Sequence, residues 1–224
     1  QPIVSASDNS VQGYEALLRS NHGQLDSPGR IIAAAEAHDM LGRVADVVAR
    51  SAARWLAKLP PAVNVFINVH PAELSDFDHV RRRFEGLREW SDRIVLEITE
   101  RSHILKLNSW RTALDSLIQD GFRIAVDDLG AGYNSLSVLA ELQPAFMKID
   151  MSIVRHIEHD ERKQRLVELL SRFAGATQTK LIVEGIETEE EASVVRRIGA
   201  DYLQGYLFGR PSMSPVPTQS HAMA

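Results

Sequence analysis

The sequence predicts an α/β protein: a closed barrel of eight strands with helices between them, whose first strand runs antiparallel to its neighbours. Short runs rich in Val, Ile and Leu alternate with helical patterns along nearly the whole chain. Strands that alternate with helices pair in parallel through right-handed crossovers. Only the segment SASDN separates the first two runs, and it is too short for a crossover helix. Those two strands are therefore expected to form an antiparallel pair.

The expected strands are mostly continuous apolar runs, which is typical of strands that are covered on both faces. In chain order they occupy residues 2–5, 11–17, 63–69, 93–99, 122–127, 145–150, 180–185 and 201–205. Eight strands in 224 residues suit a modified TIM-type (β/α)8 barrel with an antiparallel first strand.

Helices are expected between these strands. The segment 160–176 has apolar residues at the spacing of one buried helix face: Leu166, Leu169, Leu170 and Phe173. A second helix opens with a capping box made by Thr188 and Glu191 and closes on Gly199. Further helical patterns lie at 30–58, which holds two, and at 107–120.

The composition restricts the possible functions. With 44% apolar residues and no linker rich in Pro, Ser or Gly, the chain is expected to form one domain over residues 1–211 and a loose tail over 212–224. A net charge of −5 argues against a nucleic-acid binder, and the densest basic run, RRRF at 81–84, is expected to be a solvated helix face. The absence of Cys excludes disulfides and thiol catalysis.

The sequence also indicates where in the cell the protein is located. No apolar run approaches the length of a membrane span, and no secretory signal opens the chain. Because the chain begins at Gln1, we expect a piece of a longer protein. We expect a cytoplasmic domain, either alone or as the cytoplasmic part of a larger, membrane-anchored protein.

Polar residues stand at the carboxyl ends of the expected strands, where the active sites of barrels of this type lie. They are Glu15, Asn68, Glu97, Asp127, Lys148, Glu184 and Gln204. Each has an ordinary structural explanation when it is taken singly, but burial of such groups without partners is costly at every one of these positions. A cluster of carboxylate and amide oxygens repels itself unless hard cations neutralise it, and Mg²⁺ or Mn²⁺ suits such a site.

The adjacent Asp127 and Asp128 can be interpreted in two ways. Neighbouring side chains of a strand point to opposite faces, so the pair could be a strand end followed by a turn residue. Alternatively, the two carboxylates serve two metal ions about 3.5–4 Å apart. Asp127 would then bridge both ions, and Asp128, where the strand relaxes into the loop, would turn onto the second ion. The other polar strand ends favour the second interpretation.

A series of motifs resembles the EAL domain, the family of cyclic di-GMP phosphodiesterases named for a motif that stands here as Glu15-Ala16-Leu17. In chain order the motifs are QPIV, YEALLR, FINVHP, LEITE, DDLGAGYNSL, MKID, VEGIE and QGYLFGRP. The resemblance covers nearly the whole chain, and the family fold is a β/α barrel with an antiparallel first strand. This agrees with the architecture that the strand pattern predicts.

The resemblance also implies roles for individual residues. Metal ligation falls to Glu15, Asn68, Glu97, Asp127, Asp128 and Glu184. Catalytic roles fall to Lys148, which helps to hold the attacking water, to Glu184 and to the supporting carboxylate of Glu187. Substrate contacts fall to Arg19 and Gln204, and Glu100 steadies the loop at 128–136. His70, Leu129 and Asn134 depart from residues common in the family, but none of them is a ligand.

The expected function is hydrolysis of cyclic di-GMP to linear pGpG with two Mg²⁺ or Mn²⁺ ions, in bacterial second-messenger signalling. The alternative is a receptor that binds cyclic di-GMP without cutting it, although such receptors usually lack ligands that are all present here. A purely structural domain would leave the polar strand ends unexplained. The resemblance also suggests a homodimer and fusion to a sensory or GGDEF domain.

Overall fold

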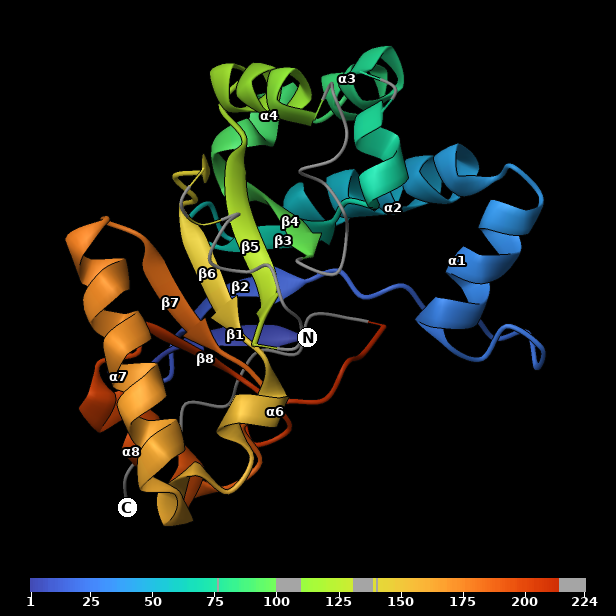
Figure 1. Ribbon diagram of the computed structural model, residues 1–224. Helices are drawn as coiled ribbons and strands as arrows, with labels where there is room; N and C mark the ends of the chain where they lie inside the picture. The colour runs from blue at the N-terminus through green and yellow to red at the C-terminus, as the bar shows by residue number, and fades with distance from the viewer. Residues whose placement is uncertain (76, 100–109, 131–138, 140, 214–224) are drawn as a thin grey trace.

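The structure is a computed structural model that describes residues 1–75, 77–99, 110–130, 139 and 141–213. Its centre is a closed barrel whose eight strands follow one another in chain order (Figure 1). The strands are β1 Pro2–Ser5, β2 Val11–Glu15, β3 Asn64–Asn68, β4 Ile94–Thr99, β5 Arg123–Leu129, β6 Phe146–Ile149, β7 Lys180–Val183 and β8 Tyr202–Gln204. Each overlaps the range predicted from the sequence, so the predicted strand order is confirmed.

The first strand is reversed, as the short SASDN connection predicts. β1 pairs antiparallel with both β2 and β8, and every other pair around the barrel is parallel. The register between β1 and β2 shifts between Ile3 and Val4, which marks a bulge at this point of the hairpin. The predicted barrel with an antiparallel first strand is therefore confirmed.

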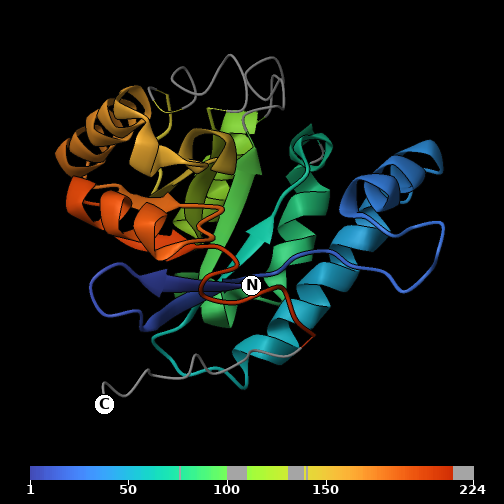
Figure 2. The same ribbon diagram turned by 90° about the horizontal axis from the view of Figure 1, so that it is seen from below.

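Helices surround the strands, with α7 and α8 on one side and α1 and α2 on the other (Figure 2). The α-helices are α1 Pro28–Ala37, α2 Leu41–Leu56, α3 Phe77–Glu85, α4 Trp110–Gln119, α6 Met151–Val154, α7 Glu161–Ala176 and α8 Glu189–Ile198. Short 3₁₀ turns, which the sequence pattern did not predict, are η1 Pro71–Ser75, η2 Arg88–Arg93 and η4 Ile157–His159. Within the described residues, no helix is both long and apolar enough to cross a bilayer. The predicted boundary after residue 211 stays a prediction, because residues 214–224 lie outside the described part of the chain.

The predicted caps of α8 are confirmed. The Thr188 side chain accepts a hydrogen bond from the Glu191 backbone N–H at 3.2 Å, and the Glu191 carboxylate accepts one from the Thr188 N–H at 3.4 Å. Gly199 ends the helix with φ +102°, a left-handed conformation that glycine adopts without steric cost.

The predicted buried face of α7 is only partly correct, because Leu170 alone of its four residues packs against the core. Leu166, Leu169 and Phe173 are exposed, with Leu169 at 64%. The fully buried residues of α7 are Val167 and Ala174, which lie two turns apart on the same face as Leu170.

The basic run RRRF is only partly the solvated face that was expected. Arg81 and Arg82 are exposed, but the Arg83 side chain is 1% exposed and pairs with the buried Glu73 of η1. Such a pair is compatible with burial because each charge neutralises the other.

Inward-pointing side chains fill the barrel in two layers. The lower layer is apolar and includes Ile3, Phe66, Val95, Ala125, Phe146 and Ile182. Gly13 lies beside Phe66, where a Cβ would come within 2.8 Å of the Phe66 ring, so only glycine leaves room for this aromatic side chain. Side chains two residues apart point to the same face of a strand. The next inward position toward the carboxyl end of each parallel strand therefore forms a second layer at the mouth.

Candidate metal and catalytic site

The second inward layer contains the polar residues that the sequence singled out. They lie one step further along the inward face than the apolar layer, within two residues of the carboxyl end of each strand: Glu15, Asn68, Glu97, Asp127, Lys148, Glu184 and Gln204. Alternation along the strands thus converts the separate strand ends of the sequence into one cluster of side chains.

The ammonium group of Lys148 is the centre of this cluster, and its side chain is fully buried. Its Nζ lies 2.6 Å from Oε1 of Glu97 and 2.7 Å from Oε1 of Glu184. It also lies 3.4 Å from Oδ1 of Asp127 and 3.7 Å from Oε2 of Glu15. One cation therefore faces four carboxylates, and the cluster has an excess of negative charge.

Two amide side chains orient these carboxylates. Nδ2 of Asn68 donates to Oε1 of Glu15 at 3.2 Å and to Oε2 of Glu97 at 2.9 Å. Nε2 of Gln204 donates to Oε2 of Glu15 at 2.6 Å. The Oε1 atom of Gln204 is buried and has no hydrogen-bond partner among the described residues, so it is an oxygen that could bind a metal ion or a ligand.

The pKa values follow from burial and crowding. Burial opposes the charge on Lys148, but the surrounding carboxylates outweigh burial and raise its pKa well above the usual value. Burial raises the pKa of Glu97 well above its ordinary range, and that of Glu184 to about 8, with Lys148 offsetting only part of the effect. At Glu15, burial is outweighed by Lys148 and two amide hydrogen bonds, so the pKa is lowered.

The carboxylates form two overlapping groups that could each hold a metal ion. Oxygen atoms of Glu15, Glu97 and Asp127 lie within 4.8 Å of one another, and so do oxygen atoms of Asp127, Asp128 and Glu184. Asp127 belongs to both groups, as the bridging role predicted from the sequence requires. The donors are oxygens and carry excess negative charge, which fits a hard divalent cation such as Mg²⁺ or Mn²⁺.

The backbone explains how two adjacent aspartates reach one site. Asp128 has φ +59°, so the chain turns left-handed there and leaves the regular alternation of the strand. The register between β5 and β6 also shifts between Val126 and Leu129. The Asp128 N–H donates to Oδ1 of Asp127 at 2.8 Å, which fixes the turn.

Two other predicted residues, Glu187 and Arg19, do not join this cluster. Glu187 is exposed and pairs with Arg155, whose guanidinium lies 2.8 Å from the Glu187 carboxylate. Arg19 is exposed and donates to the backbone oxygen of Leu18 at 2.8 Å. Glu100 and Asn134 lie outside the described residues.

Glu191 has a second role that the sequence pattern did not predict. Beyond the capping box, its carboxylate accepts hydrogen bonds from the backbone N–H groups of His156 at 3.0 Å and Glu187 at 2.9 Å. Burial opposes its charge, but the backbone hydrogen bonds outweigh burial and lower its pKa. Glu191 thus ties the loop after Glu184 to the segment before η4. The capping-box spacing identified the residue but could not indicate these partners from other loops.

Comparison with known proteins matches the EAL domain family over residues 1–211. The cyclic di-GMP phosphodiesterase NbdA of Pseudomonas aeruginosa is 31% identical over 220 residues, which cover 94% of this chain and 28% of NbdA. The probable cyclic di-GMP phosphodiesterase PdeG of Escherichia coli is 29% identical, with 94% of this chain and 43% of PdeG covered. The chain therefore spans less than half the length of these relatives.

A solved structure of Klebsiella pneumoniae BlrP1 with calcium and cyclic di-GMP superposes with a TM-score of 0.84. It is 32% identical and covers 94% of this chain and 54% of BlrP1. The same protein has also been solved with manganese and cyclic di-GMP. The match to the family model over residues 1–211, together with these relatives, shows that the chain belongs to the EAL domain family.

Proposed function

We propose that this domain hydrolyses cyclic di-GMP to linear pGpG with two Mg²⁺ or Mn²⁺ ions. The observation that carries the proposal is the pair of overlapping carboxylate groups that share Asp127 beside a buried Lys148. Relatives named as cyclic di-GMP phosphodiesterases, and neighbours solved with cyclic di-GMP and calcium or manganese, support the same substrate and cations.

The charge and position of each residue indicate its role in metal binding. Glu15, Asn68, Glu97 and Asp127 would hold one ion, and Asp127, Asp128 and Glu184 the other. When bound, two such cations favour deprotonation of a water and stabilise the attacking and leaving oxygens of an in-line displacement. They would also let an acidic site receive an anionic substrate.

Lys148 and Glu184 would manage the attacking water. The raised pKa keeps Lys148 protonated, so it serves as a hydrogen-bond donor and a fixed positive charge and not as a base. Burial raises the pKa of Glu184 to about 8 in the metal-free protein, and a cation bound beside it would favour the ionised form that can accept a proton or a hydrogen bond from the water. Their 2.7 Å contact holds the two groups in one place.

The remaining assignments rest on the family resemblance. Arg19 and Gln204 would contact the substrate, Glu187 would act as a supporting carboxylate, and Glu100 would steady the loop that follows Asp128. We also propose a homodimer, a fusion to a sensory or GGDEF domain in the full-length protein, and a cytoplasmic location. The relative MucR, named a bifunctional diguanylate cyclase and cyclic di-GMP phosphodiesterase, supports the fusion.

The test is a product assay with several cations. The purified domain is incubated with cyclic di-GMP and Mg²⁺, Mn²⁺, Ca²⁺ or a chelator, and linear pGpG is followed by chromatography. We expect turnover with Mg²⁺ or Mn²⁺, none with chelator and little with Ca²⁺, because Ca²⁺ takes more ligands in looser geometry and small misplacements cost about 10²-fold in rate.

The receptor alternative makes a different prediction for the same assay. Tight binding without product under any cation, at every protein concentration, would favour the receptor. Activity per molecule that rises with protein concentration would instead indicate an enzyme that is active as a dimer.

A further inference from the structure

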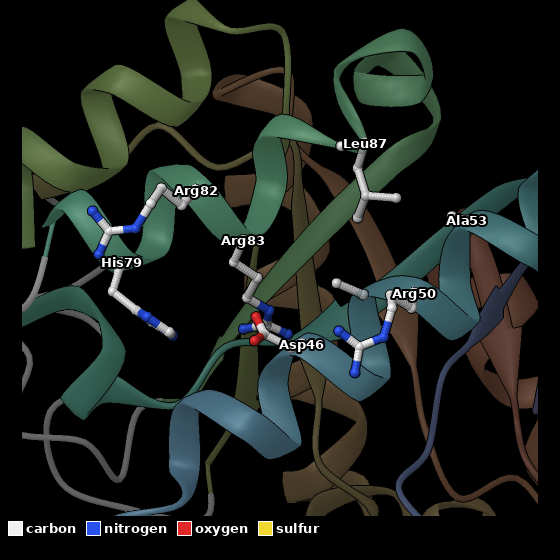
Figure 3. Close-up of a pocket in the computed structure, with 9 residues that line it drawn as sticks. Asp46, Arg50, Ala53, His79, Arg82, Arg83 and Leu87 are labelled. Carbon is white, nitrogen blue, oxygen red and sulfur yellow. The ribbon is translucent and has the colours of Figure 1, made fainter.

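A hollow lies in the helical layer outside the barrel, between α2 and α3 (Figure 3). Its volume is about 410 Å³, and small-molecule sites typically have about 300–1,000 Å³. Ala49, Ala53 and Leu87 give it an apolar wall, and none of the mouth side chains named above lines it. Its chemistry is therefore separate from that of the barrel mouth.

The charged residues around this hollow are mostly basic. Arg50 comes from α2, Arg82 and Arg83 come from α3, and Asp46 is the one carboxylate among the lining residues (Figure 3). The side chains of Arg50 and Arg82 make no hydrogen bond or ion pair with any residue that the structure describes. This excess of positive charge is local, because the chain as a whole has a net charge of −5.

Helix electrostatics account for only part of this cluster. Arg82 and Arg83 lie in the last turn of α3, where cations stabilise the negative end of the helix dipole. Arg50 lies in the interior of α2, so no helix end requires a cation there. Arg50 faces the two arginines of α3 across the hollow, and no ion pair among the described residues joins it to Asp46, one turn earlier in α2.

One of the arginines is held rigidly. The Arg83 side chain is 1% exposed and is anchored by the buried carboxylate of Glu73. Its Nε is buried and has no hydrogen-bond partner in the described part of the chain, and a buried N–H without an acceptor is energetically unfavourable. An acceptor oxygen that entered from the hollow would relieve this cost.

The His79 side chain is also fixed in place. Gly42 lies in the first turn of α2, and a Cβ at this position would come within 2.7 Å of Cε1 of His79. Glycine therefore lets the imidazole pack directly against α2, where it helps to enclose the hollow that both helices line. A walled, partly apolar hollow strengthens the field of its arginines relative to an open surface.

We propose that this hollow binds a small phosphate-bearing anion, no larger than a mononucleotide. Guanidinium groups match the oxygens of a phosphate with paired hydrogen bonds, and an unpaired arginine needs no ion pair to be broken before it binds. The volume of about 410 Å³ suits a ligand of this size, and the apolar wall would contact its uncharged part. The proposal is independent of the proposed phosphodiesterase activity.

The test uses inorganic pyrophosphate as the probe and protein freed of divalent metal on a chelating resin. Without metal the barrel mouth carries negative charge and does not compete for the anion. Affinity is measured by isothermal titration calorimetry for wild type, for Arg50→Gln/Arg82→Gln and for the control Arg43→Gln/Arg81→Gln. The control removes the same charge from exposed arginines of the same two helices that do not line the hollow.

We expect saturable binding to wild type and to the control, and an affinity at least about tenfold lower in Arg50→Gln/Arg82→Gln, since hydrogen bonds to charged groups are lost. Circular dichroism establishes whether both double variants are folded. If one double variant does not fold, its two single variants are measured in its place. No saturable binding to wild type, or equal losses in both double variants, would overturn the proposal. Binding only to phosphatidylglycerol vesicles in a sedimentation assay, without pyrophosphate binding, would also overturn it.

Discussion

The buried ammonium of Lys148 should stabilise the metal-free protein strongly, and Lys148→Met tests this. Methionine keeps a long unbranched side chain but removes the charge. In the wild type, Nζ lies 2.6 Å from Glu97 and 2.7 Å from Glu184, and two further carboxylates lie within 3.7 Å. The variant leaves these carboxylates facing one another without a cation.

The magnitude follows from the burial of the cluster. Removal of one partner from a buried ion pair costs about 3–5 kcal/mol. For a chain of 150–250 residues, 1 kcal/mol shifts Tm by about 2–4 °C, so Tm should fall by roughly 6–20 °C in metal-free buffer at neutral pH. The loss should be smaller at about pH 5, because protonation of the crowded carboxylates then replaces the missing charge.

The assay is thermal unfolding followed by circular dichroism, with and without Mn²⁺. Lys180→Met is the control, because Lys180 pairs with Asp201 at 2.7 Å but its side chain is 55% exposed, and an exposed pair is worth only about 0–1 kcal/mol. Mn²⁺ should stabilise Lys148→Met more than wild type. If Lys148→Met unfolds within 2 °C (about 1 kcal/mol) of wild type in metal-free buffer, the ammonium does not neutralise the cluster and the reasoning fails.

Other predictions concern metal binding and packing. Glu15→Ala and Asp127→Ala should each abolish production of linear pGpG with an unchanged circular dichroism spectrum, and near wild-type turnover in either would contradict the metal assignment. Gln204→Leu should weaken Mn²⁺ binding about 10–100-fold by calorimetry, because its amide orients Glu15 at 2.6 Å. Glu184 has its pKa raised to about 8, so it is mostly protonated below that pH and must lose its proton to bind metal. Mn²⁺ affinity should therefore increase as pH rises toward 8, by up to about tenfold per pH unit for each ligand proton released, whereas a flat profile would exclude the linkage. Gly205→Ala should prevent folding or lower Tm sharply, because its Cβ would lie 2.0 Å from a backbone oxygen of another loop, and a normal Tm would show that the loop can move.

Most of the barrel was predictable because its signals are local. Apolar strand runs, the short connection after the first strand and the capping box at Thr188 all act within a few residues. The mouth residues were predictable for the same reason, since a parallel barrel brings its strand ends together whatever the details of packing.

The features that the sequence did not predict depend on contacts between distant segments of the chain. The spacing of Leu166, Leu169 and Phe173 fits a buried helix face, but α7 packs Val167, Leu170 and Ala174 against the barrel instead. The sequence predicts that the strand relaxes into a loop at Asp128, but not that this residue takes the left-handed backbone conformation. A strand pattern predicts alternation, whereas a single residue with φ +59° brings adjacent carboxylates to one side.

The reversed first strand has a consequence for synthesis on the ribosome. β1 pairs with β8 as well as β2, and Ile3 lies opposite Gln204, so the barrel closes only after nearly the whole domain has been made. At about 5–20 residues per second, β1 waits roughly 10–40 s with one edge unpaired. Such an edge can recruit strands from other chains, and shortness and a bulge both discourage this. β1 has only 4 residues and has its register shift between Ile3 and Val4. Both features reduce pairing of the incomplete hairpin with strands of other chains before β8 is made.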